Sequence, residues 1–581
     1  MLIHQLRIER YRGIKSLTWN PRPGLNLVLG GGDVGKSTVL EAISTLFAPG
    51  YIPLSETDFW QREYNDGFQI RAVLSLPEEV EINHQKSFAW PWEWDGAKAI
   101  MPSTSDSETD QIPVYIFQVQ GTPELEANWE IIQPNGESIN LSANLRRQIG
   151  VVRLTSDEKS DRDLRLVYGS ALDRLLTDNA LKSRISQLLA QADLGNLLNE
   201  GARDALRALD DSLKQNALPH NLDLEVTSSQ GISIGALIGL FAESENGVSL
   251  PLSTWGSGTR RMTTLEISAK TQSDARITLI DEIERGLEPH RLRQLTRSII
   301  KNGGQSFATT HNPIAIRESS DGTLWYMDSN GKIGELDKSK VLNQQTRDPE
   351  TFLSILTIAC EGETEVGFVT YLLERAIDGS FEDYGIRVSD GGGNETVCRL
   401  LQSTSKVGLN FGGFVDNDDC LPTVWNENKQ KLGDLLFQWP EECSETNIIS
   451  KIPEERLDDI FKDEDGVVDG QRLRTIADRL ASEDKDLDSM RQLANSMGKD
   501  LREVIIQAAT GNTADVTDPA TKKQWKKHGQ SWFKSEAGGY ELAQKMFSLG
   551  AWPELKKELL PFLNAVRKNI GANEINDLVH E

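Results

Sequence analysis

The sequence is short of cysteine, of long apolar runs and of positive charge, and each shortage argues against a class of protein. Only four cysteines occur among 581 residues, and they lie far apart with no C-x-x-C pair. This argues against a disulfide scaffold and a cysteine zinc site, and fits a reducing cytoplasm. No apolar run approaches the roughly 20 residues that span a bilayer, and the N-terminus has no secretory pattern. We therefore expect a cytoplasmic protein with no membrane partner.

Basic residues are outnumbered by acidic ones. The chain has 62 Lys and Arg against 88 Asp and Glu, for a net charge of -26. Proteins that coat nucleic acid without specificity are usually basic. Any contact with DNA must then be confined to local basic patches or pass through metal ions. The acidity remains compatible with an acidic, metal-dependent active site.

The strongest motif lies near the N-terminus, where residues 30–37 fit G-x-x-x-x-G-K-[ST]. An apolar run at 25–29 precedes it, and an amphipathic helix pattern at 40–47 follows. Strand, glycine loop and helix together predict a P-loop that binds ATP, with Lys36 on the β- and γ-phosphates and the Ser37 hydroxyl on Mg²⁺. The loop residues expected to bind nucleotide are Gly30, Gly32, Gly35, Lys36, Ser37 and Thr38.

A second motif places two carboxylates at the end of an apolar strand. Residues 277–280 are apolar or β-branched, and Asp281 and Glu282 follow them. In a P-loop ATPase, Asp281 would hold Mg²⁺ through water and Glu282 would orient or deprotonate the attacking water. A strand capped by surface acids is the alternative. The P-loop upstream and the segment 286–290 downstream favour the ATPase interpretation.

Two weaker motifs complete the set expected of a P-loop ATPase. A serine and two glycines, Ser253, Gly256 and Gly258, open a predicted helix, and His311 follows a short strand. Serine-glycine turns and structural histidines are common, so neither is specific alone. Because they follow the P-loop and the acid pair in the same chain order, they resemble the signature segment and switch histidine of ABC, SMC and RecF ATPases. That resemblance implies ATP bound between two protomers, and so a homodimer or a higher homo-oligomer.

Leucine and isoleucine recur at three- and four-residue spacing from 172 to 213, which predicts a helical hairpin inserted into the ATPase. Such an insertion suits a dimerisation surface, although a solvated helical cap fits nearly as well. The predicted domains are the ATPase at 1–168 and 222–347, the insertion at 169–221, and a second α/β unit at 348–581.

In the second unit, strands predicted at 352–360, 385–388 and 411–415 alternate with helices, which favours a small parallel sheet. Ligands collect at the carboxyl ends of such strands. Oxygen ligands suit Mg²⁺, Mn²⁺ or Ca²⁺, and two such ions could activate water and stabilise a leaving phosphodiester oxygen. A glycine run at 391–393 could also let backbone N–H groups approach a phosphate. The acids that fall at this edge are Glu361, Glu365, Asp416 and Asp418.

Glu361-Gly362 followed by Asp416-x-Asp418 resembles the Toprim domain of topoisomerases, primases and OLD-family nucleases. Fusion to an ABC-type ATPase narrows the resemblance to the OLD family of ATP-dependent endonucleases, which includes Gabija-type antiphage nucleases. The resemblance implies a further metal-binding glutamate and a catalytic lysine, for which Glu445 and Lys534 are our choices. Glu442 and Lys527 are their rivals. The resemblance to the OLD family also leaves open whether the protein works with a helicase-like partner protein.

Two further stretches concern partners. Residues of about 454–520 are charged and helical in pattern, and we expect a helical insertion with a solvated face. Residues 521–534 carry five lysines with Trp525 and Trp532 between them. This is the best local candidate for contact with the DNA backbone, although a basic surface helix is an even alternative.

The predicted fold class is α/β: an ABC/SMC/RecF-like P-loop ATPase with an inserted helical dimerisation hairpin, followed by a Toprim domain with helical additions. The leading function is an ATP-regulated, metal-dependent DNA endonuclease, in antiphage defence or DNA processing. The alternative is a RecF- or SMC-like DNA-repair ATPase whose Toprim domain is not catalytic. A topoisomerase or primase ranks last, because no strand-passage domain or zinc module is recognisable.

Overall fold

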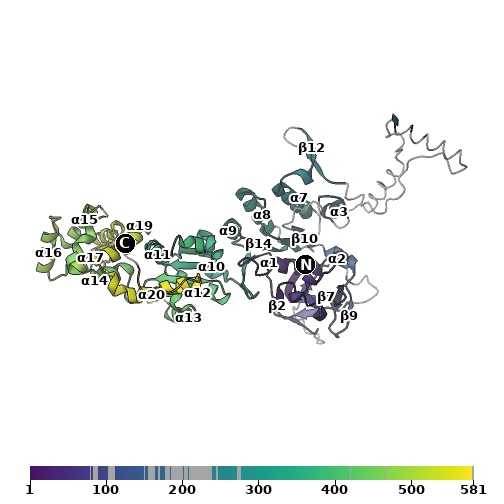
Figure 1. Ribbon diagram of the computed structural model, residues 1–581, viewed down its shortest axis with the longest axis horizontal. Helices are drawn as coiled ribbons and strands as arrows, with labels where there is room; N and C mark the ends of the chain where they lie inside the picture. The colour runs from purple at the N-terminus through teal and green to yellow at the C-terminus, as the bar shows by residue number, and fades with distance from the viewer. Residues whose placement is uncertain are drawn as a thin grey trace. The chain divides into compact units, whose positions relative to one another are not determined.

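The computed structural model describes the chain in two compact units (Figure 1), namely Met1–Leu25 with Ser37–Thr309, and Asn26–Lys36 with Thr310–Glu581. The second unit includes the P-loop segment, and the domain boundary at 348 stays a prediction. The described residues are 1–581 apart from 79, 81, 83–88, 103–111, 150, 155–163, 168–169, 177–183, 185–199, 202–203, 205–206, 208–237, 244–246, 271–276, 302, 419–420, 464 and 579–581.

The first unit contains an antiparallel sheet with strand order β2-β1-β4-β7-β5-β6, and β8 and β9 continue from β7. Its strands alternate buried and more exposed residues, as expected of a sheet with one face on a core. Strand β1 pairs with both β2 and β4, and both pairings are antiparallel. The main strands are β1 (Leu2–Tyr11), β2 (Ile14–Trp19), β4 (Phe68–Ser75), β5 (Trp92–Trp94), β6 (Ala99–Ile100), β7 (Ile112–Gly121), β8 (Ala127–Ile132) and β9 (Ser138–Asn140).

The same unit holds three parallel strands, β10 (Val151–Leu154), β13 (Ile277–Ile280) and β14 (Gln305–Thr309). Every residue of β14 is buried, which is typical of parallel strands covered on both faces. Helices α7 (Ser257–Lys270) and α8 (Pro289–Lys301) flank β13 in the sequence. The predicted strand before Asp281 is therefore confirmed.

Of the predicted helical hairpin, the described residues include α3 (Ala171–Leu176) and the isolated helical residues 184, 200, 201, 204 and 207. The rest of that prediction, and the return of the ATPase at 222, lie outside them. After the insertion the chain forms a two-stranded hairpin of β11 (Phe241–Glu243) and β12 (Ser249–Pro251).

The second unit begins with the P-loop strand. In it β3 (Leu25–Leu29) pairs in parallel with β15 (Thr323–Met327), and β16 (Ile333–Glu335) is antiparallel to β15. All five residues of β3 are buried. The loop leads into α1 (Lys36–Leu46), as the pattern of strand, loop and helix predicts.

A four-stranded parallel sheet follows in the order β18-β17-β19-β20. The strand predicted at 352–360 begins only at Leu356, because Pro349–Phe352 forms a 3-10 turn. The strand predicted at 385–388 is shifted to 386–390. The elements are β17 (Leu356–Cys360), α11 (Glu363–Ala376), β18 (Ile386–Asp390), α12 (Asn394–Lys406), β19 (Phe411–Val415), α13 (Pro422–Leu432) and β20 (Leu436–Gln438).

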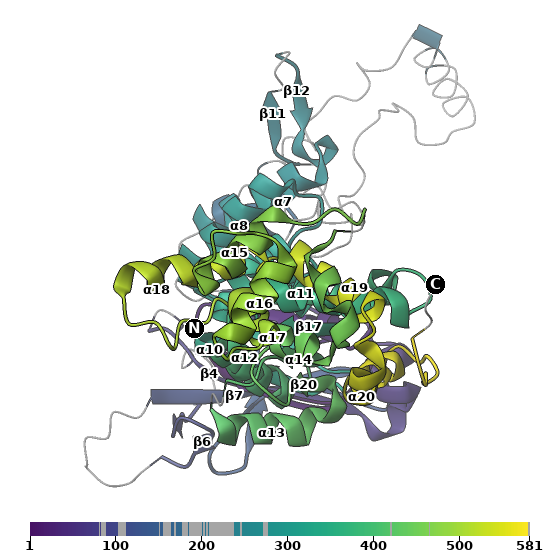
Figure 2. The same cartoon turned by 90° about the vertical axis from the view of Figure 1, so that its left-hand side faces the viewer.

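Helices complete the second unit and share one core with the sheet (Figure 2). Phe414 of β19 stacks on Phe437 and contacts Phe562, while Phe461 and Ile476 of the predicted insertion lie fully buried in the same core. The segment is therefore helical as predicted but is built into the unit. The helices of this C-terminal part of the unit are α14 (Ser444–Lys451), η11 (Glu454–Phe461), α15 (Gly470–Leu480), α16 (Leu487–Ser496), α17 (Leu501–Thr510), α18 (Pro519–Lys526), α19 (Glu536–Ser548) and α20 (Trp552–Asn569).

Candidate active site

The acids gather where the chain order of the small parallel sheet reverses. From β17 the chain goes to β18 on one side, whereas from β19 it goes to β20 on the other. In open α/β sheets, ligands bind in the crevice outside the carboxyl ends of the two strands at such a switch point. Glu361 directly follows β17 and Asp416 directly follows β19. The two acids therefore occupy the expected edge of the sheet.

Glu361 and Asp416 are connected by hydrogen bonds. The backbone N–H of Asp416 donates to Glu361 Oε2 at 3.1 Å. The side-chain amide of Asn394, the first residue of α12, donates to the same Glu361 oxygen at 3.2 Å and to the Asp416 carbonyl at 2.9 Å. Asn394 was not among the residues expected from sequence, although it directly follows the predicted glycine run.

Asp416 and Glu365 are bridged by Ser444 at the start of α14. The Ser444 hydroxyl lies 3.3 Å from Asp416 Oδ1 and 3.2 Å from Glu365 Oε1, and the Ser444 N–H donates to Asp416 Oδ1 at 3.1 Å. Trp439 Nε1 donates to the same hydroxyl at 2.8 Å. Ser444 was also missed, because a serine beside a chosen glutamate gives no distinctive sequence signal.

Lys534 and Glu445 meet in the same cluster. Lys534 Nζ lies 2.8 Å from Glu445 Oε1, although 89 residues separate them in the sequence. Glu445 is fully buried, and its Oε2 has no hydrogen-bond partner among the described residues. The structure thus brings together Glu361, Glu365, Asp416, Glu445 and Lys534. Asp418 is exposed, and it acts on Glu361 through its charge.

Burial and mutual repulsion raise the pKa values of these carboxyl groups. Burial, followed by the charges of Glu365 and Glu361, raises the pKa of Asp416 to about 9. Burial and the charge of Glu445 raise the pKa of Glu365 to about 7, and burial raises the pKa of Glu361. Burial lowers the pKa of Lys534, but the charge of Glu445 outweighs it, so the net pKa is raised. The cluster needs positive charge to ionise completely.

Close packing of two helices sets the position of Lys534. A Cβ on Gly539 of α19 would lie 1.8 Å from the carbonyl oxygen of Thr364 in α11, and a Cβ on Gly367 of α11 would lie 1.8 Å from that of Glu536. Only glycine permits this approach. Thr364 Oγ1 also donates to the Phe533 carbonyl at 3.0 Å. The start of α11, which carries Glu365, is thereby fixed against the residues around Lys534, and Figures 1 and 2 both show α11 beside α19.

The donor set of the cluster fits a divalent cation in its chemistry. Several carboxylates converge, and the Oε2 atom of the fully buried Glu445 has no hydrogen-bond partner among the described residues. Yet among the described residues no group of three or more His, Cys, Asp and Glu side chains is already arranged to hold a metal ion. Ser444 bonds to oxygens of Asp416 and Glu365 that a cation would take, and Lys534 pairs with an oxygen of Glu445. Binding would require the carboxylates to exchange these partners.

The side chains of the two rival residues are not part of the bonded cluster described above. Glu442 accepts a hydrogen bond from Thr446, and Lys527 is an exposed residue at the end of α18. The geometry therefore favours Glu445 and Lys534 over them.

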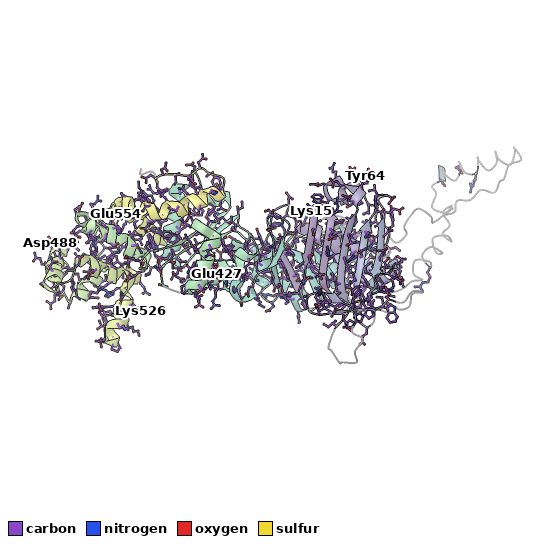
Figure 3. All side chains as sticks on the ribbon, turned by 90° about the horizontal axis from the view of Figure 1, so that it is seen from below. Lys15, Tyr64, Glu427, Asp488, Lys526 and Glu554 are labelled. Atoms are coloured by element: carbon purple, nitrogen blue, oxygen red, sulfur yellow. The ribbon has the colours of Figure 1, made fainter. Side chains whose placement is uncertain are left out.

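The basic segment is only partly as expected. Its lysines are exposed, and Figure 3 shows Lys526 on α18 at the surface of the unit. Trp532, however, is buried and donates to Thr475 Oγ1 at 3.0 Å, and Arg479 lies over the ring of Trp525. Trp532 therefore belongs to the core, whereas Trp525 is half-buried beside Arg479.

The glycine run is also used differently from the expectation. The N–H groups of Gly391 and Gly393 donate to the Cys360 and Glu361 carbonyls, both at 2.8 Å, and that of Gly392 donates to Asp390 Oδ1. The three N–H groups are therefore bound within the protein and do not form a phosphate cradle.

The P-loop has the backbone that its glycines predict. Gly30 and Gly35 have φ values of 150° and 104°, which L side chains rarely adopt. A Cβ on Gly30 would also lie 2.5 Å from the Met327 carbonyl oxygen of β15. Lys36 Nζ donates to the carbonyls of Gly30 and Gly31 at 3.0 and 2.5 Å. Gly32 and Thr38 lie in the same loop and in the first turn of α1.

In the first unit, Ser37 and the predicted Mg²⁺ aspartate are joined. Ser37 Oγ donates to Asp281 Oδ1 at 3.0 Å, and Thr309 Oγ1 donates to the same oxygen at 2.7 Å. The N–H of Glu282 donates to Thr309 Oγ1 at 2.8 Å. Thr309, at the end of β14, was missed by the sequence analysis although it lies two residues before His311. These residues form one polar network at the carboxyl ends of β13 and β14.

Arg261 of α7 holds the turn after β13. It is buried, and its guanidinium donates to the carbonyls of Asp281, Glu282 and Arg285 at 2.8 to 3.0 Å. Glu282 has a φ of 48°, an unusual value for a non-glycine residue. We infer that Arg261 stabilises this turn, and no sequence motif marks it beyond its place in the predicted helix.

The signature-like segment and the histidine lie where their motifs suggest. Ser253 belongs to a short 3-10 turn, and α7 begins at Ser257, just after Gly256. A Cβ on Gly258 would lie 2.4 Å from the Gly286 carbonyl oxygen, so the start of α7 packs closely on the loop after Glu282. His311 is exposed and lies two residues after the end of β14.

Comparison with known proteins identifies the ATPase part. Residues 100–317 match the family model described as "AAA domain, putative AbiEii toxin, Type IV TA system". The chain therefore contains an ATPase domain, and with the P-loop it is a P-loop ATPase for which ATP is the implied ligand. The match includes Asp281 and His311.

A curated relative and several solved structures match more loosely. The DNA replication and repair protein RecF of Moorella thermoacetica is 34% identical over 93 residues, which are 14% of this chain and 24% of that protein. The chain thus matches about a quarter of that relative's length. An SMC head bound to the C-winged helix domain of ScpA covers 59% of this chain and 100% of its own, at 14% identity and a TM-score of 0.34. The structure of the recombination mediator protein RecF with ATPrS covers 58% of this chain and 98% of its own, at 13% identity and a TM-score of 0.31.

Within the described part of the chain, no helix is both long and apolar enough to cross a membrane.

Proposed function

We propose that this protein is an ATP-regulated, divalent-metal-dependent DNA endonuclease of the OLD type, with a Toprim-like nuclease site at the switch point of the small parallel sheet. The observation that carries the proposal is the convergence of Glu361, Glu365, Asp416 and Glu445 with Lys534. A buried acid cluster of this kind is costly unless it binds cations. The proposed biological role is antiphage defence or DNA processing.

Each residue has a distinct proposed role. Glu361, Glu365, Asp416, Asp418 and Glu445 would hold Mg²⁺, or Mn²⁺ or Ca²⁺ in its place. When bound, the ions would supply an activated water and charge stabilisation for the leaving oxygen. The Lys534 ammonium would leave Glu445 and stabilise negative charge on the phosphate. The burial of the cluster keeps bulk water away from these charges.

The ATPase would control access to the cluster. In this proposal the P-loop binds the nucleotide through Lys36 and Ser37, and His311 contacts the γ-phosphate. The γ-phosphate is capped by Ser253, Gly256 and Gly258 of a second copy. Asp281 would hold Mg²⁺, and Glu282 would activate the water that attacks ATP. A homodimer is therefore expected, and the exposed lysines of α18 are candidates for contact with the DNA backbone.

One assay tests the proposal. Supercoiled plasmid is incubated with Mg²⁺ or Mn²⁺ and with wild type, Asp416→Ala or Lys36→Ala. We expect wild type to nick or cut the plasmid and Asp416→Ala to lose the activity by at least about 1,000-fold, while Lys36→Ala loses ATP turnover and changes the rate of cutting. Glu442→Ala is the matched control and should cut like wild type.

A second function is favoured by the match to RecF and by the absence of a ready metal cage among the described residues. A RecF- or SMC-like DNA-repair ATPase would leave the plasmid intact in every metal and would turn over ATP faster when DNA is added. Ligatable relaxed circles would instead indicate a topoisomerase.

A further inference from the structure

We propose that Asn394, locked by Trp425, is a positioning residue that holds Glu361 against Asp416 in the geometry that binds the divalent cation. The inference rests on the proposed function, because it names the residue that organises that metal site. The loop that carries Asn394 was expected to contact phosphate, and the structure assigns it this different role.

The orientation of the Asn394 amide is fixed by chemistry. Trp425 Nε1 donates to Asn394 Oδ1 at 3.0 Å. An indole N–H can only donate, so the oxygen of the amide must face Trp425 and its NH₂ group must face away. That NH₂ group then donates to Glu361 Oε2 at 3.2 Å and to the Asp416 carbonyl at 2.9 Å. Asn394 is 5% exposed and Trp425 is also 5% exposed, so water does not compete for these bonds.

The glycine run delivers Asn394 to this position. Gly391 and Gly393 donate to the carbonyls of Cys360 and Glu361, which ties the loop to the end of β17. Gly393 has a φ of 107°, and a Cβ on Gly391 would lie 3.0 Å from the Cys360 carbonyl oxygen. Two of the three glycines are therefore required for the first turn of α12 to approach the acids this closely.

A donor aimed at a ligating carboxylate has a known physical effect. It selects one orientation of the carboxylate before the cation arrives and lowers the cost of ordering it. Loss of such a partner typically weakens metal binding by about 10- to 100-fold. Because Asn394 touches the carboxylate and neither the substrate nor the reacting atoms, it positions and does not react.

The test compares Mn²⁺ binding to the full-length, nucleotide-free protein by titration calorimetry. Asn394→Asp keeps the size but replaces the NH₂ group by a charged oxygen facing Glu361. We expect Mn²⁺ affinity to fall by about 10- to 100-fold. Trp425→Phe removes the indole donor together with part of the buried ring but leaves Asn394 itself in place, and it should lower the affinity by about three- to tenfold. In both variants saturating Mn²⁺ should restore part of the plasmid cutting, since the groups that react are intact.

A matched control separates positioning from folding. Asn428 is fully buried on the same helix as Trp425 and donates to the Cys398 carbonyl at 2.9 Å. Asn428→Asp should lower the melting temperature as Asn394→Asp does, yet leave the Mn²⁺ affinity per folded molecule unchanged. Should Asn394→Asp not fold, Trp425→Phe alone decides the question.

The outcomes are distinguishable. A wild type that cuts DNA and binds Mn²⁺, with Asn394→Asp and Trp425→Phe within twofold of it in affinity, overturns the positioning role and leaves the nuclease standing. A wild type that neither binds Mn²⁺ without nucleotide nor cuts DNA overturns both. A loss of affinity in Asn428→Asp equal to that in Asn394→Asp shows general damage and also overturns the positioning role.

Discussion

The P-loop and the acid cluster are built in opposite ways. The P-loop is one continuous segment in which Lys36 bonds to carbonyls five and six residues earlier. The acid cluster draws Glu361, Asp416, Glu445 and Lys534 from the ends of two strands, a helix start and the loop before α19. A local motif is maintained by its own backbone, whereas a dispersed cluster depends on packing far from its charges. The acid cluster should therefore be the easier of the two to break at a distance.

The largest effect is expected at Gly539, which touches no acid. In Gly539→Ala the new Cβ would overlap the Thr364 carbonyl, so α11 and α19 must separate. We expect a loss of about 3 kcal/mol in the free energy of unfolding, measured by urea denaturation, and loss of plasmid cutting, with ATP binding retained. Gly470→Ala is the control, because no heavy atom lies within 4 Å of its added Cβ. An unchanged denaturation curve for Gly539→Ala would contradict the packing argument.

Next in size is the Lys534→Met variant. It leaves the fully buried Glu445 without its cation, but the Lys534 side chain is 37% exposed, so the penalty is reduced. We expect about 2 kcal/mol of destabilisation, less than for a fully buried pair. Adding Glu445→Gln to the same chain should recover most of it, as measured in a double-mutant cycle. Equal stability of Lys534→Met and wild type would show that the ion pair contributes little.

A smaller effect, with a defined pH dependence, is expected for Asp416→Asn in EDTA. The pKa of Asp416 is raised to about 9 in the folded state from 3.8. Between pH 3.8 and about 9, the folded protein therefore binds more protons than the unfolded chain. The contribution of Asp416 to the free energy of unfolding then falls as the pH rises from about 4 to 9. Asp416→Asn should therefore melt at a higher temperature than wild type at pH 8, and the difference should vanish near pH 4. Asp418→Asn, at an exposed position, should show no such difference.

The smallest effect is expected in the ATPase. Thr309→Val removes the hydroxyl that bonds Asp281 Oδ1 and accepts the Glu282 N–H. We expect a stability loss of about 1 kcal/mol and a roughly tenfold fall in ATP turnover with ATP affinity nearly unchanged, because binding depends on the loop. Thr296→Val, which removes a buried hydroxyl within α8, should leave turnover intact. A matched loss in both variants would assign the effect to folding.

Sequence reasoning succeeded where a feature is local. The P-loop, the strand before Asp281 and the β19 strand before Asp416 were all predicted within a residue or two, since each depends on a short apolar run and its neighbours. It was weaker where distant segments meet. Trp532 was grouped with surface lysines, and its burial against η11 and α15 could not be seen from composition.

What the sequence alone determined is the set of chemical groups and their nearest backbone: a phosphate loop, an acid pair after β13, and acids at the ends of β17 and β19. What only the tertiary structure decided is which of these groups touch. Glycine contacts between α11 and α19 bring Lys534 to Glu445, and the tryptophan-locked amide of Asn394 turns toward Glu361 and Asp416. The physical reason is that such contacts depend on packing between elements distant in the chain, which residue spacing does not record.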